Sequence, residues 1–257
     1  MARAMVMGVL NVTPDSFSDG GLFADAAVAI EHGRRLFAEG ADIVDVGGES
    51  TRPGSEPVSV DAECERVVPV IAALASVGRV SVDTSKAAVA EAAIAAGATV
   101  VNDISASLAH VAAAHGAGWV AMHMQGTPGT MQVAPSYDDV VEEVVAFLAE
   151  RTETGRAAGV TEMWIDPGIG FGKTLDHNLA LLRHLRRFVA TGVPVAVGAS
   201  RKGFLGTLTG GAAADDRLEA SLAVATWAFS QGVSMVRAHD VAATVQAARI
   251  VTEEVAA

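Results

Sequence analysis

Short apolar runs rich in Val and Ile alternate along the chain with Ala-rich stretches whose apolar residues recur at helical spacing. Stretches of the second kind cover residues 25–41, 86–98 and 220–232, and each has a glycine near its C-terminal end. The apolar runs, which we predict to be strands, are Met5–Leu10, Ile43–Val46, Arg79–Val82, Thr99–Val101, Trp119–Met122, Met163–Ile165, Val193–Val197 and Ser234–Val236. Eight strands that are each followed by a helix predict parallel βα units.

The placement of polar residues favours closure of these units into a barrel. No Pro/Ser-rich linker or charge block divides the series, so we expect residues 1–257 to form a single domain of class α/β, a (β/α)8 TIM barrel. A doubly wound open sheet would show the same periodicity. In α/β barrels, however, functional groups collect at the C-terminal ends of the strands. Nearly every run ends in such groups, which are Asn11, Asp45, Glu49, Asp83, Asn102, Asp103, His123, Asp166, Ser200, Arg237 and His239.

Composition narrows the choice of ligands. Hydrophobic residues make up 51% of the chain and the formal net charge is −12, which argues against nucleic acid and against an anionic membrane surface as partners. An anionic ligand would need a local cluster of cations. The single cysteine, Cys64, cannot form an internal disulfide, and the N-terminal segment has no apolar stretch long enough to span a bilayer. We therefore expect a cytoplasmic protein.

Cations follow the last two predicted strands. Ser200, Arg201 and Lys202 come after the seventh, and Arg237 and His239 end the eighth. Barrels often bind phosphate groups with the loops after these two strands, and Arg and Lys are suited to phosphate oxygens. Alternatively, these cations could be solvated or paired with carboxylates of the barrel. Their grouping in two neighbouring loops favours an anion site.

A second group could hold a flat heterocycle. Asp83, Asn102 and Asp166 end the third, fourth and sixth strands, and with Lys202 they could match the donors and acceptors of an aminopyrimidinone ring. The alternative is that these groups satisfy one another and the cations of the barrel. The Gly-rich stretch 166–174 lacks the first glycine of a P-loop, because Pro167 stands there. Its glycines more simply let the backbone approach a ligand beside Phe171.

Two loops rich in Gly, Pro, Ser and Asp follow the first two strands, at residues 11–21 and 47–54. Loops of this kind on a rigid barrel often clamp substrates. Thr51 and Arg52 could hold a phosphate, and Asn11 with Asp19 could hold a metal or a developing positive charge, although each loop could also be a plain turn. His123 has no second His or Cys at zinc spacing, so we expect it to be a hydrogen-bonded structural group.

Eight segments taken together resemble the strand-end signatures of the dihydropteroate synthase family, in the order of that family. They are MGVLNVTPDSFSDGG, IVDVGGESTRPG, VSVDTSK, VVNDIS, MHMQGTPGTMQ, WIDPGIGFGK, VGASRKGFLG and VRAHDV. The resemblance covers essentially the whole chain and implies a pterin-binding TIM barrel. The implied reaction condenses 6-hydroxymethyl-7,8-dihydropterin pyrophosphate with p-aminobenzoate to give 7,8-dihydropteroate and pyrophosphate. It also implies Mg²⁺ as cofactor and a homodimer.

The resemblance further implies a role for each matching residue. The pterin ring would be bound by Asp83, Asn102, Met122, Asp166, Gly170, Phe171, Lys202 and Arg237. The pyrophosphate would be bound by Asn11, Thr51, Arg52, Arg237 and His239, with Asn11 as the Mg²⁺ contact. The p-aminobenzoate site would comprise Phe17, Ser18, Pro53, Ser200 and Lys202. Catalysis would depend on Asn11, Asp19, Arg52, Lys202, Arg237 and His239.

Two alternative interpretations remain open. A pterin-binding methyltransferase barrel would share the carboxylates but not the first loop or the STRPG and SRK segments, all of which this chain has. A non-catalytic pterin-binding paralogue would be expected to have lost Arg52, Lys202 or His239, and this chain keeps all three. The chain departs from the family pattern in a shorter stretch between Asn102 and His123, and in Ala106, where glycine is frequent.

Overall fold

The computed structural model of the chain describes residues 4–13, 22–51 and 55–252. Its strands are β1 (Met5–Asn11), β2 (Ile43–Gly47), β3 (Arg79–Asp83), β4 (Val100–Asp103), β5 (Gly118–Met122), β6 (Met163–Asp166), β7 (Ala196–Val197) and β8 (Met235–Ala238). The helices are α1 (Leu22–Ala38), α2 (Val60–Leu74), α3 (Ala87–Ala95), α4 (Ala109–His115), α5 (Val140–Ala158), α6 (Leu175–Arg183), α7 (Leu185–Val189), α8 (Gly203–Leu208), α9 (Leu218–Ser230) and α10 (Val241–Thr252), with a short 3-10 helix at Ala214–Asp216.

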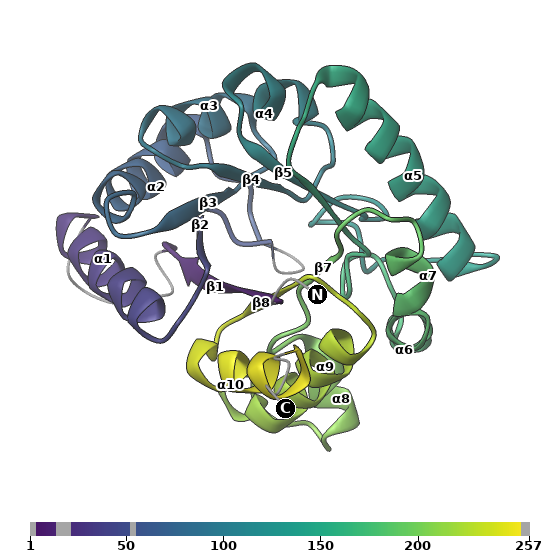
Figure 1. Cartoon of the computed structure of the whole chain (residues 1–257). Coiled ribbons are helices and arrows are strands. Elements are labelled where there is room, and N and C mark those ends of the chain that lie inside the picture. Colours follow the sequence, from purple (N-terminus) through teal and green to yellow (C-terminus); the bar gives the residue numbers. More distant parts are fainter. Residues whose placement is uncertain (1–3, 14–21, 52–54, 253–257) are drawn as a thin grey trace, which may run out of the picture.

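The eight strands form one parallel sheet in the order β6-β5-β4-β3-β2-β1-β8-β7. The two ends of this series meet through a bridge between Ile165 and Val195, where Ile165 N donates to Pro194 O at 2.9 Å. The sheet therefore closes, and the helices surround it (Figure 1). This confirms the predicted (β/α)8 barrel and excludes the doubly wound open sheet.

Strand β7 is shorter than predicted. The apolar run from Val193 to Val197 suggested five residues, whereas only Ala196 and Val197 form regular strand. Pro194 has no N–H to donate to a neighbouring strand, so the pairing with β6 is reduced to the single bridge at Val195. The other strand ends lie within one or two residues of the prediction.

Alternation along the strands separates an inner from an outer face. Strand residues that point into the barrel form a small apolar cluster comprising Met7, Ile43, Val100, Val120, Trp164, Ala196 and Met235. The larger core lies between the outer face and the helices, with fully buried residues such as Leu36, Ile71, Leu148 and Phe188. The inner cluster, which we call the apolar plug, fills the lower part of the barrel and leaves the C-terminal ends of the strands for polar groups.

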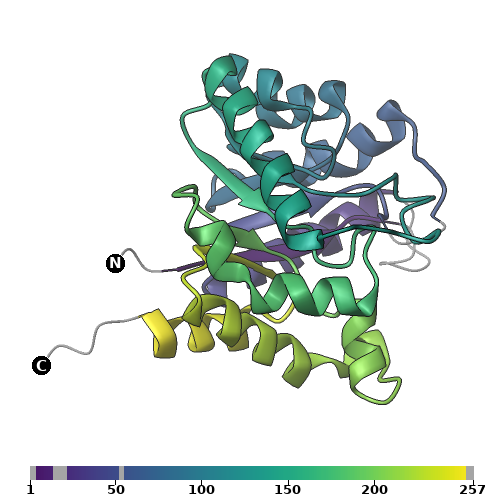
Figure 2. The same cartoon turned by 90° about the vertical axis from the view of Figure 1, so that its right-hand side faces the viewer.

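Strand β1 begins and helix α10 ends on the same side of the molecule, as Figure 2 shows, while the long loop after β5 lies on the opposite side. The loops that follow the strands thus share one end of the barrel, and this end carries the polar residues. Within the part of the chain that the structure describes, no helix is long and apolar enough to cross a membrane.

Candidate active site

The polar residues of the barrel lie directly above the apolar plug. Side chains two positions after the residues of the plug point to the same inward face of the barrel. On β2, β4, β5, β6, β7 and β8 these are Asp45, Asn102, Met122, Asp166, Gly198 and Arg237. Asp83 stands in the same relation to Ser81 on β3. We call this layer, together with Lys202, the mouth. On β2, β4, β6 and β8 a step of two residues therefore leads from the apolar plug to a polar group of the mouth.

Arg237 connects three strands in the mouth. Its Nε donates to Asp45 Oδ2 at 2.6 Å and its Nη2 donates to Asp83 Oδ2 at 2.8 Å. Asn102 Nδ2 donates to the same oxygen of Asp45 at 2.9 Å. The Asp45 side chain is completely buried, so its carboxylate depends on these two partners for compensation of its charge. Asp45 was not among the predicted site residues, although it shares the inward face with Asp83 and Asn102.

Asp166 lies beside this network. A Cβ atom added to Gly198 would lie 3.8 Å from Arg237 Cδ and 3.9 Å from Asp166 Oδ2, so the two side chains flank one point just beyond β7. Asp166 Oδ1 accepts a hydrogen bond from Gly168 N at 2.7 Å. Burial raises the pKa of Asp166, and the Gly168 N–H and the nearby cations oppose this shift. The structure therefore brings Asp83, Asn102, Asp166 and Arg237 into one region, as predicted.

Lys202 completes the mouth from the loop after β7. Its Nζ lies 3.6 Å from the centroid of the Phe171 ring, a cation–π distance. A Cβ atom on Gly170 would lie 2.9 Å from Lys202 Cδ, so a larger residue there would displace the lysine. Burial lowers the pKa of Lys202 to about 7, while Asp166 raises it. Burial likewise raises the pKa of Asp83 to about 7, against the effect of Arg237.

The turn at Arg201 separates Lys202 from its neighbour. Arg201 has a positive φ of 59°, which is unfavourable for a residue with a Cβ atom. The turn is held by Arg201 N, which donates to Ser221 Oγ at 3.0 Å, and by Arg217 Nη1, which donates to Arg201 O at 2.9 Å. The Arg201 guanidinium binds Asp240 through Nε and Nη2 at 3.1 and 2.6 Å. Arg201, which we grouped with the anion cluster, is therefore paired with a carboxylate, as the alternative interpretation expects, and a role in anion binding stays a prediction.

His239 is paired with Ser200. Ser200 Oγ accepts from His239 N at 3.2 Å and lies 3.0 Å from His239 Nδ1. Burial, and then the charge of Arg237, lower the pKa of His239 to about 3. The anion-site interpretation groups His239 with the cations. This low pKa makes it a neutral imidazole near neutral pH, and its proton lies on Nε2 when the Ser200 hydroxyl donates to Nδ1.

The loop after β6 is fastened to the loop after β5. Lys173 Nζ lies 3.0 Å from His123 Nδ1 and donates to Phe171 O at 2.8 Å. Gln132 Nε2 donates to Gly170 O at 2.9 Å, and the Tyr137 hydroxyl donates to Gly172 O at 2.8 Å. These contacts fix the backbone of the residues that face Lys202.

Glycine is required where these two loops touch. A Cβ atom on Gly168 would lie 1.8 Å from His123 O, and one on Gly172 would lie 2.4 Å from Gln125 O. The glycines of residues 166–174 thus allow contact between two backbones as well as approach to a ligand. Burial lowers the pKa of His123 to about 3 and that of Lys173 to about 7. His123 is the hydrogen-bonded structural group that we predicted, whereas the positioning role of Lys173 was missed.

Several predicted residues are placed less fully. Asn11 Oδ1 and Asp83 Oδ2 would lie 3.6 and 3.7 Å from a Cβ atom on Gly47, so Asn11 borders the mouth. Met122 is buried and pairs in register with Asp166. Thr51 is half-buried and is the last described residue before 52–54. Phe17, Ser18, Asp19, Arg52 and Pro53 lie outside the described residues. The roles of all these residues stay predictions.

The described residues of the mouth could hold a metal ion only together with a bound ligand that also coordinates it. Among the described residues, no group of three or more His, Cys, Asp or Glu side chains could hold a metal ion. Asn11 contributes one amide oxygen at the edge of the mouth. Mg²⁺ commonly binds through one or two protein oxygens plus substrate phosphates and water. The residues present are therefore compatible with Mg²⁺ that arrives together with a diphosphate, and Asn11 is the described residue that would contact it.

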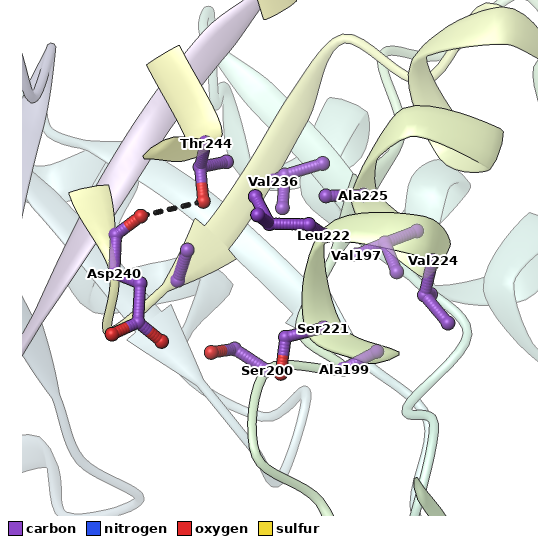
Figure 3. Close-up of a pocket in the computed structure, with 11 residues that line it drawn as sticks. Val197, Ala199, Ser200, Ser221, Leu222, Val224, Ala225, Val236, Asp240 and Thr244 are labelled. Carbon is purple, nitrogen blue, oxygen red and sulfur yellow. Dashed lines mark hydrogen bonds between the residues drawn. The ribbon is translucent and has the colours of Figure 1, made fainter. Parts of the chain in front are cut away.

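A cavity behind strands β7 and β8 is separate from the mouth. Figure 3 shows it between the barrel wall and helix α9, lined by side chains such as Val197, Val236 and Ala225. Val197 and Val236 belong to the outer core, so they point away from the barrel interior. The lining is mainly apolar and includes Ser200, a predicted p-aminobenzoate contact, but none of the predicted pterin-binding residues. This cavity therefore does not alter the assignment of the candidate site.

Comparison with known proteins agrees with this arrangement. The family model described as pterin binding enzyme matches residues 7–239. A dihydropteroate synthase of Escherichia coli strain K12 is 45% identical over 98% of this chain and 92% of its own length, and one of Mycobacterium leprae is 46% identical over 98% and 93%. The Xanthomonas albilineans enzyme solved in complex with 7,8-dihydropteroate superposes with a TM-score of 0.86 at 43% identity, covering 97% of this chain and 92% of that one.

The chain therefore belongs to the family of pterin-binding enzymes, on the evidence of both its barrel and its sequence. Within that family it falls among the dihydropteroate synthases, which are transferases. The methyltransferase barrel is not supported, because relatives that match over nearly their full length carry the synthase name.

Proposed function

We propose that this chain condenses 6-hydroxymethyl-7,8-dihydropterin pyrophosphate with p-aminobenzoate, and that the mouth is where it does so. The observation that carries the proposal is the convergence of Asp83, Asn102, Asp166 and Lys202 around Arg237. This is the reaction that the name dihydropteroate synthase describes. Solved relatives include complexes with 4-aminobenzoic acid and with 7,8-dihydropteroate.

The pterin ring presents an edge of N–H donors and acceptors. Asp83 and Asp166 can accept from ring N–H and amino groups, and the Asn102 amide can both donate and accept. Lys202 can donate to the carbonyl edge. Met122 and Phe171 offer apolar surface to the ring, and the Arg237 guanidinium can stack on it. Because Asp83 and Lys202 both have pKa values of about 7, a ligand that supplies matching partners can draw both into their charged forms.

The diphosphate is assigned to the rim of the mouth. Arg237 supplies charge there, the neutral His239 donates from Nε2, and Asn11, Thr51 and Arg52 are the further predicted contacts. Mg²⁺ bound with the diphosphate would neutralise part of its charge and so improve it as a leaving group. The hydrogen-bond donors of the protein also favour departure of the leaving group, since their hydrogen bonds to the departing pyrophosphate are stronger than those to the bound ester.

The chemical step then needs no protein nucleophile. The bond between the pterin methylene carbon and the diphosphate oxygen breaks, and its electron pair leaves with pyrophosphate. The ring system delocalises the resulting cation, which Asp19 is predicted to stabilise. The amine nitrogen of p-aminobenzoate forms the new bond to the methylene carbon and loses one proton to the departing pyrophosphate or to water. In this scheme the protein binds the two substrates, orients them and screens the charge of the diphosphate.

The p-aminobenzoate site is assigned to Phe17, Ser18 and Pro53, with Lys202 and Ser200 nearby. The Ser200 hydroxyl is hydrogen-bonded to His239, so we propose that Ser200 acts mainly by orienting that histidine. We also propose a cytoplasmic homodimer, on the resemblance and the single cysteine. Light scattering that gives the mass of one chain of 26.2 kDa would exclude the dimer.

The test is an assay of pyrophosphate release with the pterin pyrophosphate in the presence and absence of p-aminobenzoate and of Mg²⁺. We expect rapid release only when all components are present, with formation of an equal amount of dihydropteroate. A protein that binds the pterin pyrophosphate but forms no dihydropteroate would be the non-catalytic paralogue. This outcome would overturn the proposal.

A further inference from the structure

An ion triad lies beside the mouth, outside the residues assigned above. Lys86 Nζ lies 2.6 Å from Glu49 Oε2 and 2.5 Å from Glu63 Oε2. The Glu63 side chain is completely buried, whereas those of Lys86 and Glu49 are 23% and 20% exposed. Glu63 Oε1 has no hydrogen-bond partner within the described parts of the chain. Lys86 is therefore the cation that compensates a buried carboxylate.

Stability alone does not account for this arrangement. Burial of the Glu63 carboxylate is costly even with a cation beside it, and well-packed apolar residues are often as stabilising as a buried ion pair. The triad is better explained if its hydrogen bonds are needed to hold particular segments of the chain in fixed positions. The elements that it joins show what it fixes in place.

The three residues come from different parts of the barrel end. Glu49 lies two residues after β2, Lys86 lies three residues after β3, and Glu63 is in the first turn of α2. Lys86 thus connects the loop after β2 to the loop after β3 and to helix α2. Two residues beyond Glu49 stands Thr51, a predicted phosphate contact.

The Glu49 carboxylate also bonds to residues on the far side of the loop after β2. Glu49 Oε1 accepts from Val58 N at 2.9 Å, while Glu49 Oε2 faces Lys86. Ser55 Oγ donates to Ser50 O at 2.5 Å, and Arg66 Nη1 donates to Gly48 O at 2.7 Å. Residues 48–50 and 55–58 are therefore bonded to each other and to the barrel. The conformation of Glu49, and with it the start of this loop, depends on the charge of Lys86.

We propose that Lys86 is a positioning residue for substrate binding: through Glu49 and Glu63 it holds the segment that follows β2 so that Thr51 can engage the diphosphate of the substrate. The inference rests on the proposed function. It predicts an effect that is larger with the diphosphate, since the ring-binding residues Asp83, Asn102 and Asp166 are held by other hydrogen bonds and Glu63 reaches Asp83 only through its charge, which raises the pKa of Asp83.

The experiment compares two ligands by calorimetry. Lys86→Met should weaken the affinity for the pterin pyrophosphate at least 10-fold and leave the affinity for 6-hydroxymethylpterin, which lacks the diphosphate, within 2-fold. Lys86→Arg, which can bridge both carboxylates, should recover most of the loss. Equal weakening of both ligands, or of neither, would overturn the proposal. In turnover, we expect KM for the pterin pyrophosphate to rise more than kcat falls.

Two further variants guard against misfolding. Glu49→Gln leaves the Lys86–Glu63 pair intact and can still accept from Val58 N, and it should weaken diphosphate-dependent binding in the same direction. Arg79→Met is the matched control, because Arg79 pairs with Glu162 at 2.7 Å at the opposite end of β3. It should leave both affinities unchanged. If wild-type protein binds the pterin pyrophosphate and Glu49→Gln binds it equally well, the positioning role is excluded while the proposed function stands; if wild-type protein forms no product, the proposed function fails.

Discussion

Lys173 Nζ lies 3.0 Å from His123 Nδ1, and both side chains are buried between the loops that follow β5 and β6. A histidine that accepts through Nδ1 is neutral and carries its proton on Nε2. The lysine donates to this nitrogen and to Phe171 O. The pair therefore fixes the loop that places Gly170 and Phe171 against Lys202.

This burial predicts acid sensitivity. In the unfolded chain His123 binds a proton below about pH 6.5, whereas in the folded protein its pKa is about 3. The unfolded state therefore binds more protons between these values, so the free energy of unfolding should fall as the pH is lowered from 6.5 towards 3. His123→Asn should reduce this slope by up to about 1.4 kcal/mol per pH unit. Urea denaturation at several pH values measures it. His115→Asn, at an exposed position on α4, is the control, and equal slopes for His123→Asn and wild type would refute this explanation.

Gly168→Ala should be strongly destabilising. The new Cβ atom would lie 1.8 Å from His123 O, and the residue has a φ of +67°. The two loops would have to separate, at a cost of roughly 3 kcal/mol or more from backbone strain and overlap. Gly129→Ala is the control, since an added Cβ atom meets nothing within 4 Å there. Chemical denaturation should show a large loss for the first variant and little change for the second. Equal stability of the two variants would mean that the contact between the loops is not tight.

Lys202→Ala should nearly abolish turnover. Lys202 is the cation that faces Phe171 and is coupled electrostatically to Asp166, and loss of a preorganised donor commonly costs about 100-fold or more in kcat. The rate of pyrophosphate release is the measurement. Arg183→Ala, at an exposed position in α6, should retain full activity. Near-normal turnover of Lys202→Ala would remove this residue from the active site.

Asp166→Asn should weaken pterin binding. The amide can keep the hydrogen bond from Gly168 N through its oxygen, but its NH2 group would face a ring donor where a carboxylate oxygen stood. An unmatched buried polar contact costs about 1–3 kcal/mol, so the affinity for 6-hydroxymethylpterin should fall roughly 5- to 150-fold by that measure. Calorimetry with Asp138→Asn, an exposed position, as control tests this. Unchanged affinity would show that Asp166 does not contact the ring.

Much of the barrel could be predicted because the signals were local. The apolar runs marked the strands, and Asp83, Asn102 and Asp166 were found because they stand at the ends of these runs. The alternation of side chains along a strand, applied to Ile43 and Asp45, would have added Asp45 to the mouth, since the two residues share the inward face of β2.

Other features depend on contacts that the sequence does not signal. Arg201 and Lys202 are adjacent, yet one binds Asp240 and the other enters the mouth, because Arg201 adopts a left-handed conformation that is rare for residues other than glycine. The neutral state of His239 results from its burial in the folded barrel and from the charge of Arg237. No role was predicted for Lys173, because its partner, His123, lies 50 residues away along the chain.

The central claim is that one polar mouth holds the pterin ring and the diphosphate together. A crystal structure of the chain with the pterin pyrophosphate tests it most directly. We predict the ring edge against Asp83, Asn102 and Asp166, with Lys202 beside it and the diphosphate at Asn11, Arg237 and His239. A ring bound outside the barrel, or a diphosphate directed away from Arg237, would contradict it.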